Sequence, residues 1–407
     1  WLGWLRRRQE SRSFGQRRFL YGEAEFSAAF EDGQLLRVHR SSSGHFQVLM
    51  ESSKWTRFRV SAFSHTVIRV TGGDWPAAKG IVVRKHGEDW KYLSPSKNKP
   101  VLTLTAGESS ELAWRPPFSN RENNALFESV KTKFHAFKSV HAVSEVLYRS
   151  NEGIDIHTLW VWSPYAKEKT RVPRLCPGMF PLNEKGGPLL PLQRPIVVII
   201  ARSHYAETAT SFVLRGMLQS IVGDSALRAK VLHQFSFVFI AGMSGEGAET
   251  DPLKNLLRFV AENMRLFAVL ELSGTGQDVR LEGPQLYQTT HFDQLLFPQF
   301  FAKLLRSQGS GTPRLVFGKR TAHSLMKRIE QWISSPRLFA LQADFAPPTA
   351  IVDDRRRLEG LGLKLLEALA STAIFSQGLA RTMLAPSFQR LFQRLRPAPS
   401  AHTRLKG

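Results

Sequence analysis

The sequence predicts a mixed α/β protein in which a small antiparallel β-sandwich precedes the α/β part. Between residues 24 and 122, short apolar segments alternate with turn residues, a pattern typical of strands in two packed sheets. Between residues 123 and 383, helical patterns alternate with short, continuously apolar runs, which indicates a mixed sheet with helices on both faces. A basic arm, residues 1–23, and a basic tail, residues 384–407, flank these two predicted domains.

Five strands are predicted in the first domain. Each one either alternates between apolar and polar residues or runs apolar, and Gly, Ser, Asp or Pro separates it from the next. They lie roughly ten to twenty residues apart, a spacing typical of antiparallel sandwiches. The predicted strands are residues 46–50, 58–63, 66–70, 80–84 and 101–105.

The second domain is predicted to combine buried strands with helices. Ile196 to Ala201 is an unbroken apolar run, as expected of a central strand that is buried on both faces. The Pro- and Gly-rich stretch 173–195 predicts a loop before it. Strands 154–162, 196–201, 235–241 and 267–272 are expected together with helices 125–146, 210–221, 253–264 and 352–370.

Charge is the unusual feature of the composition. The chain has 56 Lys and Arg residues against 34 Asp and Glu residues, so its formal net charge is +22. Such a protein attracts acidic partners such as nucleic acid, anionic lipid or an acidic protein tail. The sequence has no zinc finger, no Gly-rich phosphate loop and no aromatic RNA-binding motif, so sequence-specific nucleic-acid binding is not expected.

Cysteine usage and apolar runs restrict the class further. Cys176 is the only cysteine, which excludes an intrachain disulfide and a zinc site of the Cys₄ or Cys₂His₂ type. The longest apolar run, 196–201, is far too short for a transmembrane helix. Arg6–Arg8 directly follow the apolar first residues, so no signal-peptide core forms. We therefore expect a soluble, cytoplasmic protein.

The sharpest chemical signal is the pair His204 and Glu207, which directly follows the predicted central strand. In α/β sheets, ligands bind at the carboxyl ends of the strands. Zinc accepts both imidazole and carboxylate, and a catalytic zinc typically has three protein ligands plus a water. The pair therefore predicts two zinc ligands, although His-x-x-Glu also occurs by chance.

Residues 194–208 (Arg-Pro-Ile-Val-Val-Ile-Ile-Ala-Arg-Ser-His-Tyr-Ala-Glu-Thr) resemble the zinc-binding segment of the cytosolic carboxypeptidases. This family is the tubulin-deglutamylating branch of the carboxypeptidase A-like metallopeptidases, and its pattern is Arg-Pro, an apolar run, then Ala-Arg-x-His-Pro-Gly-Glu-Thr. The similarity is collinear over most of residues 25–370 and includes 151–159 and 338–345. It implies a carboxypeptidase-like mixed sheet flanked by helices, and a zinc ion held by His204 and Glu207.

The sequence departs from the family pattern at three places, each of which takes part in zinc-dependent peptide hydrolysis in the family. The family's third zinc ligand, the first His of Asp-x-His-Gly-His, corresponds to Ser273, and a neutral hydroxyl is a poor zinc donor. The family's catalytic Glu of Tyr-Thr-Leu-Glu corresponds to Gln342, whose amide cannot take a proton from zinc-bound water. The segment with the Asn-Arg pair that grips the substrate's terminal carboxylate is missing after Gly247.

The departures favour a catalytically inactive member of the family that binds acidic protein tails, such as those of tubulin, in the cytoplasm or on the cytoskeleton. One alternative is an active zinc carboxypeptidase with a rearranged site, in which a third ligand joins His204 and Glu207. His291 and His323 do not occupy family ligand positions. The other alternative is a non-enzymatic scaffold whose basic arms bind an anionic partner or a membrane.

Overall fold

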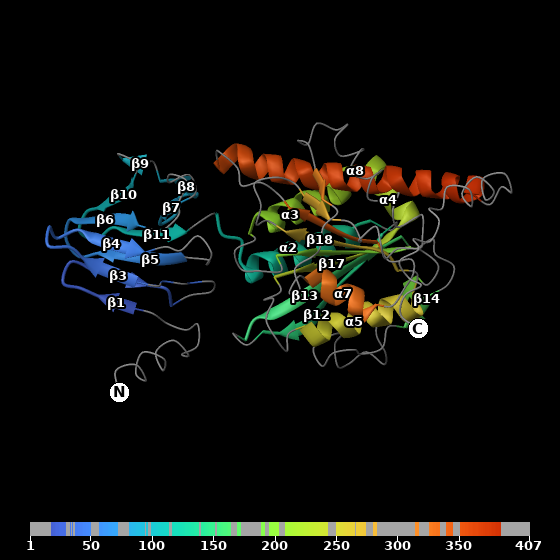
Figure 1. The fold of residues 1–407 in the computed structure, drawn as a ribbon, viewed down its shortest axis with the longest axis horizontal. Helices are drawn as coiled ribbons and strands as arrows, with labels where there is room; N and C mark the ends of the chain where they lie inside the picture. The colour runs from blue at the N-terminus through green and yellow to red at the C-terminus, as the bar shows by residue number, and fades with distance from the viewer. Residues whose placement is uncertain are drawn as a thin grey trace, which may run out of the picture.

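In the computed structural model the chain forms a β-sandwich and an α/β domain, so the predicted fold class is confirmed (Figure 1). The exact domain boundaries stay a prediction. None of the described helices is both long enough and apolar enough to cross a membrane. The structure describes residues 18–29, 33, 35, 37–49, 57–71, 81–93, 95–96, 99–113, 116–137, 140–150, 153–163, 169–171, 189–191, 195–202, 208–242, 250–264, 266–273, 280–282, 314–316, 325–333, 339–344 and 351–383.

Two sheets form the sandwich. Within the described residues, one sheet has the strand order β1-β2-β5-β11-β7-β8 and the other the order β3-β4-β6-β10-β9. Their inner faces share one apolar core, in which the rings of Phe26 and Phe46 come from different sheets and lie 5.1 Å apart. The strands are β1 (Arg18–Leu20), β2 (Ala24–Ser27), β3 (Arg37–Arg40), β4 (Phe46–Leu49), β5 (Arg57–Ala62), β6 (Thr66–Thr71), β7 (Val82–Lys85), β8 (Lys91–Tyr92), β9 (Pro95–Ser96), β10 (Lys99–Leu104) and β11 (Ser109–Ala113).

The alternation of side chains explains why these segments become strands. In β5, Phe58, Val60 and Ala62 are buried in the core, whereas Arg57 and Arg59 lie on the outer face. The period of two puts every second residue on the same face of a strand. All five strands predicted for this domain are confirmed to within two residues at each end.

The α/β domain is built on one mixed sheet with the order β12-β13-β17-β16-β18-β21-β19-β20 among the described strands. Strands β17, β16, β18 and β21 are parallel neighbours, while β13 and β19 run antiparallel to them. The strands are β12 (His141–Arg149), β13 (Asp155–Trp162), β16 (Ile196–Ala201), β17 (Ser236–Ala241), β18 (Leu266–Ser273), β19 (Arg280–Glu282), β20 (Arg314–Val316) and β21 (Phe339–Asp344), with β14 (Lys169–Arg171) and β15 (Leu189–Pro191) forming a separate pair.

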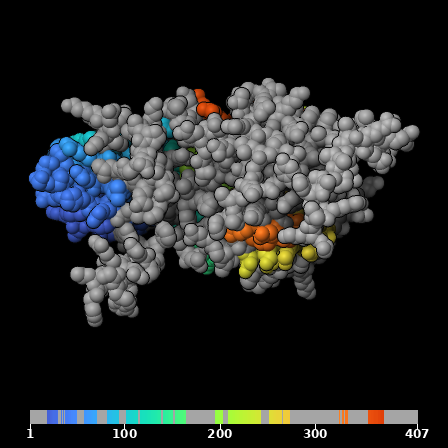
Figure 2. Space-filling view, in the orientation of Figure 1, coloured from blue at the N-terminus to red at the C-terminus, as the bar shows by residue number. Residues whose placement is uncertain are grey.

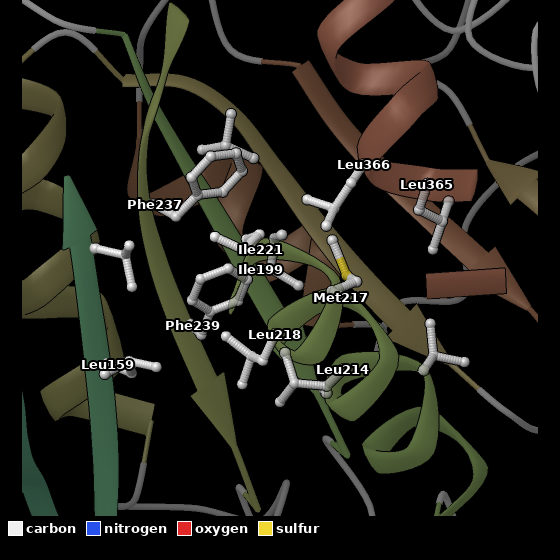
Figure 3. Close-up of a cluster of buried hydrophobic side chains, with 14 of the residues drawn as sticks. Leu159, Ile199, Leu214, Met217, Leu218, Ile221, Phe237, Phe239, Leu365 and Leu366 are labelled. Atoms are coloured by element: carbon white, nitrogen blue, oxygen red, sulfur yellow. The ribbon is translucent and has the colours of Figure 1, made fainter. Parts of the chain in front are cut away.

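Helices cover both faces of this sheet (Figure 1). Val197 and Ile199 of β16 pack against α3 and α8 on one face, whereas Val198 and Ile200 pack against α5 and α7 on the other. Figure 3 shows Ile199 beside α3 side chains such as Leu218, and Figure 2 shows α5 and α7 next to each other on the surface. The helices are α2 (Asn120–His135), α3 (Thr208–Gly223), α4 (Ser225–Gln234), α5 (Thr250–Asn263), α7 (Leu325–Trp332) and α8 (Ile351–Met383).

The predicted helix over 125–146 is wrong in its second half. The helix begins earlier, at Asn120, because Ser119 and Glu122 form a capping box. It ends at His135, and His141–Arg149 is strand β12. Buried and less buried residues alternate through the first part of β12, which is the pattern of a strand and not of a helix.

The order of connections divides the helices between the two faces. The chain runs from β16 through α3 and α4 to β17, and then through α5 to β18 on the other side of β16. Right-handed crossovers that run in opposite directions along a sheet place their helices on opposite faces. Helices α3 and α5 do lie on opposite faces, so the carboxyl end of β16 is a topological switch point.

Helices α3 and α8 cross at unusually close range. A Cβ atom added to Gly216 would lie 2.1 Å from the carbonyl oxygen of Glu359, and one added to Gly362 would lie 2.2 Å from the carbonyl oxygen of Val213. Arg215 reinforces the crossing, since its Nε donates a 2.8 Å hydrogen bond to Glu359. Glycines at these two positions therefore allow backbone-to-backbone contact.

This crossing predicts opposite effects for two neighbouring glycines of α8. Gly362→Ala is expected to lower the free energy of unfolding by about 1–3 kcal/mol, because the new methyl group must push α3 and α8 apart. Gly360→Ala is the matched control, since a Cβ there meets nothing within 4 Å; it is expected to stabilise by about 0.5–1 kcal/mol through helix propensity. Urea unfolding measures both, and equal effects would contradict the close crossing.

Candidate functional site

The carboxyl ends of the four parallel strands lie along one edge of the sheet. In the register, Ala201 at the end of β16 is paired with Ala241 of β17 and with Leu272 of β18. Ser273, the last residue of β18, is paired with Asp344, the last residue of β21. The switch point at β16 is therefore flanked by the ends of β17 and β18, where α/β sheets bind ligands.

The predicted zinc pair falls between the end of β16 and the start of α3. His204 and Glu207 themselves lie outside the described residues. Arg202 before them and Thr208 after them are both buried. The described residues on both sides of the pair are therefore buried at the carboxyl end of β16 and at the start of α3.

The two substituted positions lie on adjacent strands of the same sheet. Ser273 ends β18, and Gln342 is in β21, where it is paired with Glu271 of β18. The backbone thus brings both positions to the edge where β16 ends. Glu271 is buried, with 4% of its surface exposed. His291 and His323, the two histidines outside the family ligand positions, lie outside the described residues.

A buried arginine that the sequence analysis missed closes the end of β16. Arg202 is 1% exposed, and its backbone has a φ of +56°, a conformation that is uncommon outside glycine. Its backbone N–H donates a 2.8 Å hydrogen bond to Oγ1 of Thr210 in the first turn of α3. Its Nη1 donates a 3.1 Å hydrogen bond to Oδ1 of Asn120 at the start of α2. Arg202 therefore joins β16, α3 and α2 at one point.

The end of β17 is part of the same arrangement. Gly242 follows β17, has a φ of +86°, and donates its backbone N–H to the carbonyl oxygen of Ala201 at 3.2 Å. A Cβ atom on Gly242 would lie 2.0 Å from Oδ1 of Asn120. The side chain of Asn120 thus fills the place that any other residue at 242 would need. A Gly directly after an apolar strand was the available sequence signal.

The described residues do not form a metal site. Within the described ranges, no group of three or more His, Cys, Asp or Glu side chains is arranged to hold a metal ion. Ser273 corresponds to the third ligand only by the resemblance, and a neutral hydroxyl is a poor partner for zinc beside imidazole or carboxylate. The donors among the described residues at this edge therefore do not by themselves fit a resident zinc ion.

No family model matches the sequence, and no curated protein matches it. Solved structures do match. The metallo-carboxypeptidase from Burkholderia cenocepacia is similar over 86% of this chain and 99% of its own, with a TM-score of 0.63 and 13% identity. The putative carboxypeptidase A from Shewanella denitrificans is similar over 86% of this chain and 98% of its own, with a TM-score of 0.61 and 14% identity.

A third structure agrees with these two. The metallo-carboxypeptidase from Pseudomonas aeruginosa, in complex with (2-guanidinoethylmercapto)succinic acid, covers 85% of this chain and 98% of its own, with a TM-score of 0.59 and 14% identity. Coverage this high is more than the α/β part could supply alone, so the likeness extends into the sandwich. At such low identity the comparison establishes the fold, and the predicted carboxypeptidase-like fold is confirmed.

The contact between Gly242 and Asn120 predicts that one methyl group added at residue 242 strongly lowers the stability of the protein. Gly242→Ala is expected to destabilise the protein by about 2 kcal/mol more than Gly153→Ala, because both positions have left-handed backbone but only residue 242 meets another side chain. Gly153, at φ +76°, has nothing within 4 Å of its Cβ position. Thermal and urea unfolding of both variants measure the difference.

Substitution of Asn120, the residue that contacts Gly242, provides the control. Asn120→Ala removes the clashing oxygen, so a double variant with Gly242→Ala is expected to lose less stability than the sum of the two single changes. Strict additivity, or equal losses at residues 153 and 242, would show that Asn120 does not pack on Gly242.

Proposed function

We propose that this chain is a zinc-carboxypeptidase-like protein of the cytosolic, tubulin-deglutamylating branch that has lost catalysis and binds acidic protein tails. The observation that carries the proposal is the position of Ser273 and Gln342 on the neighbouring strands β18 and β21, beside the end of β16. Positions 273 and 342 thus lie on adjacent strands close to the carboxyl end of β16, which supports a shared role for them.

The two substitutions remove different parts of one reaction. When bound, a catalytic zinc lowers the pKa of a water molecule and polarises the scissile carbonyl. His204 and Glu207 would supply two of the three protein ligands that such a site needs, and Ser273 does not supply the third. Gln342 cannot act as a general base, and losing a general base typically costs about 10²–10⁴ in rate. Either change alone is severe for a hydrolase.

The short connection after β17 supports the same conclusion. Strand β17 ends at Ala241 and α5 begins at Thr250, so few residues lie between them. In the cytosolic carboxypeptidases that the sequence resembles, this connection carries the Asn-Arg pair that holds the terminal carboxylate of a peptide substrate. A site without that pair has no strong means of selecting a free C-terminus.

The charge of the chain supports binding of acidic tails. A net charge of +22 attracts a polyglutamate segment over long range and raises the rate of encounter. Acidic tails of tubulin, in the cytoplasm or on the cytoskeleton, are the partners that the resemblance suggests. A protein that keeps the fold without the reaction would then bind glutamate-rich tails and not cut them.

Zinc content tests the loss of catalysis. The wild-type protein, purified without chelators, is expected to hold no zinc above background and to release no glutamate from an oligoglutamate substrate. Ser273→His is expected to raise the zinc content toward about one ion per chain, because it restores a third ligand. Elemental analysis measures the stoichiometry.

Two controls make this test decisive. Ser273→Ala changes the same position without adding a ligand and is expected to stay free of zinc. Adding His204→Ala to the Ser273→His variant should remove the gained zinc. A wild-type protein with one zinc that His204→Ala removes would contradict the loss of catalysis and favour the rearranged active site.

Peptide binding tests the acidic partner. A fluorescent oligoglutamate peptide is expected to bind the full chain, with an affinity that falls steeply as salt is raised, while an oligoglutamine peptide of the same length does not bind. Fluorescence anisotropy measures both. If deleting residues 1–17, which leaves β1 intact, together with residues 387–407 abolishes binding, the basic arms are the site and the scaffold alternative is favoured instead.

A further inference from the structure

The outer face of the first sheet of the sandwich carries a pocket of about 530 Å³. It lies where β5, β11 and β7 are neighbours, and the turn at His86 and Gly87 after β7 lines it at one end. The volume is within the range of small-molecule sites, about 300–1,000 Å³. None of its lining residues belongs to the candidate site on the α/β domain.

Charged residues form a row across this pocket. Glu111 of β11 is paired directly with Arg59 of β5 on one side and with Arg84 of β7 on the other. Side chains that are directly opposite in antiparallel strands lie on the same face, within contact distance. The row Arg59, Glu111 and Arg84 therefore follows from the register of the sheet.

Three guanidinium groups share the single carboxylate of this row. Arg59 Nη2 donates to Oε1 of Glu111 at 2.8 Å, while Arg57 Nη2 and Arg84 Nη2 each donate to Oε2 at 3.1 Å. Burial alone would raise the pKa of Glu111, but the hydrogen bonds and positive charges of these arginines outweigh it and lower the pKa. Glu111 is therefore ionised at neutral pH, and the cluster keeps an excess of two positive charges.

The other charged residues around the pocket do not cancel this excess. Lys85 Nζ donates to Oε1 of Glu108 at 2.8 Å, and Lys91 Nζ donates to Oε2 of Glu88 at 2.9 Å. Each of these two pairs is neutral by itself. The net positive charge is therefore concentrated on the cluster of Glu111 with Arg57, Arg59 and Arg84.

The arginines are also held in place before any ligand arrives. The guanidinium of Arg84 lies 4.8 Å from the ring centre of Trp90, and that of Arg57 lies 5.9 Å from the same ring. Trp90 is buried, whereas the side chains of Arg84 and Arg59 are 36% and 53% exposed. Stacking fixes the plane of a guanidinium and so reduces the entropy lost when it binds an anion.

We propose that this pocket binds a soluble phosphate monoester, whose phosphate group contacts Arg59 and Arg84 on either side of Glu111. A phosphate monoester carries a charge of about −1.5 to −2 at neutral pH, which matches the two excess positive charges better than a single carboxylate does. Planar guanidinium groups bind phosphate oxygens in bidentate fashion. The rest of the pocket leaves room for a small organic group.

Calorimetric titration of the full chain with glycerol 3-phosphate and with inorganic phosphate, in sulfate-free buffer, tests this proposal. Both probes are expected to bind saturably, and acetate is not. Arg84→Gln is expected to weaken glycerol 3-phosphate binding roughly tenfold or more, as for hydrogen bonds between charged groups. Arg59→Gln, at the more exposed position, gives the same test if Arg84→Gln does not fold.

The matched control is Arg69→Gln, which removes one exposed arginine from β6 in the other sheet and is expected to change the affinity less than about twofold. Glu111→Gln is expected to tighten binding, because it removes the negative charge that the ligand must approach. Absence of saturable binding to the wild-type protein, or equal weakening by Arg69→Gln and Arg84→Gln, would overturn the proposal.

Discussion

The burial of β16 on both faces is the constraint on which the rest of the α/β domain depends. All six of its residues are buried, so helices must cover both sides of the strand. The chain meets this requirement by crossing from β16 to β17 over one face and from β17 to β18 over the other. The same arrangement that buries the strand therefore also creates the switch point at its carboxyl end. The connections that bury the apolar strand thus also place its carboxyl end where α/β sheets bind ligands.

Arg202 directly follows β16 and lies between this buried strand and the polar edge of the sheet. A fully buried guanidinium is costly to remove from water and is tolerated only where hydrogen bonds satisfy it. Asn120 accepts one of these hydrogen bonds, and its own position against Gly242 is set by the capping box that starts α2. Residues from α2, β16 and β17 thus depend on one another. This mutual dependence gives the carboxyl ends of β16 and β17 a fixed geometry.

The sequence predicted the buried parts of the fold better than its polar contacts. Apolar runs such as Ile196–Ala201 and alternating strands such as β5 follow from a local periodicity, so their positions could be predicted. The prediction placed β12 in a helix because its Val and Ala residues, at mixed spacing, fit a helix and a strand equally well. The cap at Ser119 determines where the helix begins. The contact between Arg202 and Asn120 joins residues that are 82 apart in sequence, and no local pattern carries such information.

The packing of the α/β domain is separate from Ser273 and Gln342, the two polar positions on the neighbouring strands β18 and β21. Ser273 is the last residue of β18, and Gln342 lies two residues before the end of β21. Their replacement does not touch the crossing of α3 and α8 or the packing on β16, which hold the domain together. In this fold, the residues that pack the domain are different from those at the edge where α/β sheets bind ligands. The sheet, the switch point and the contacts of Arg202 are therefore compatible with different residue types at positions 273 and 342.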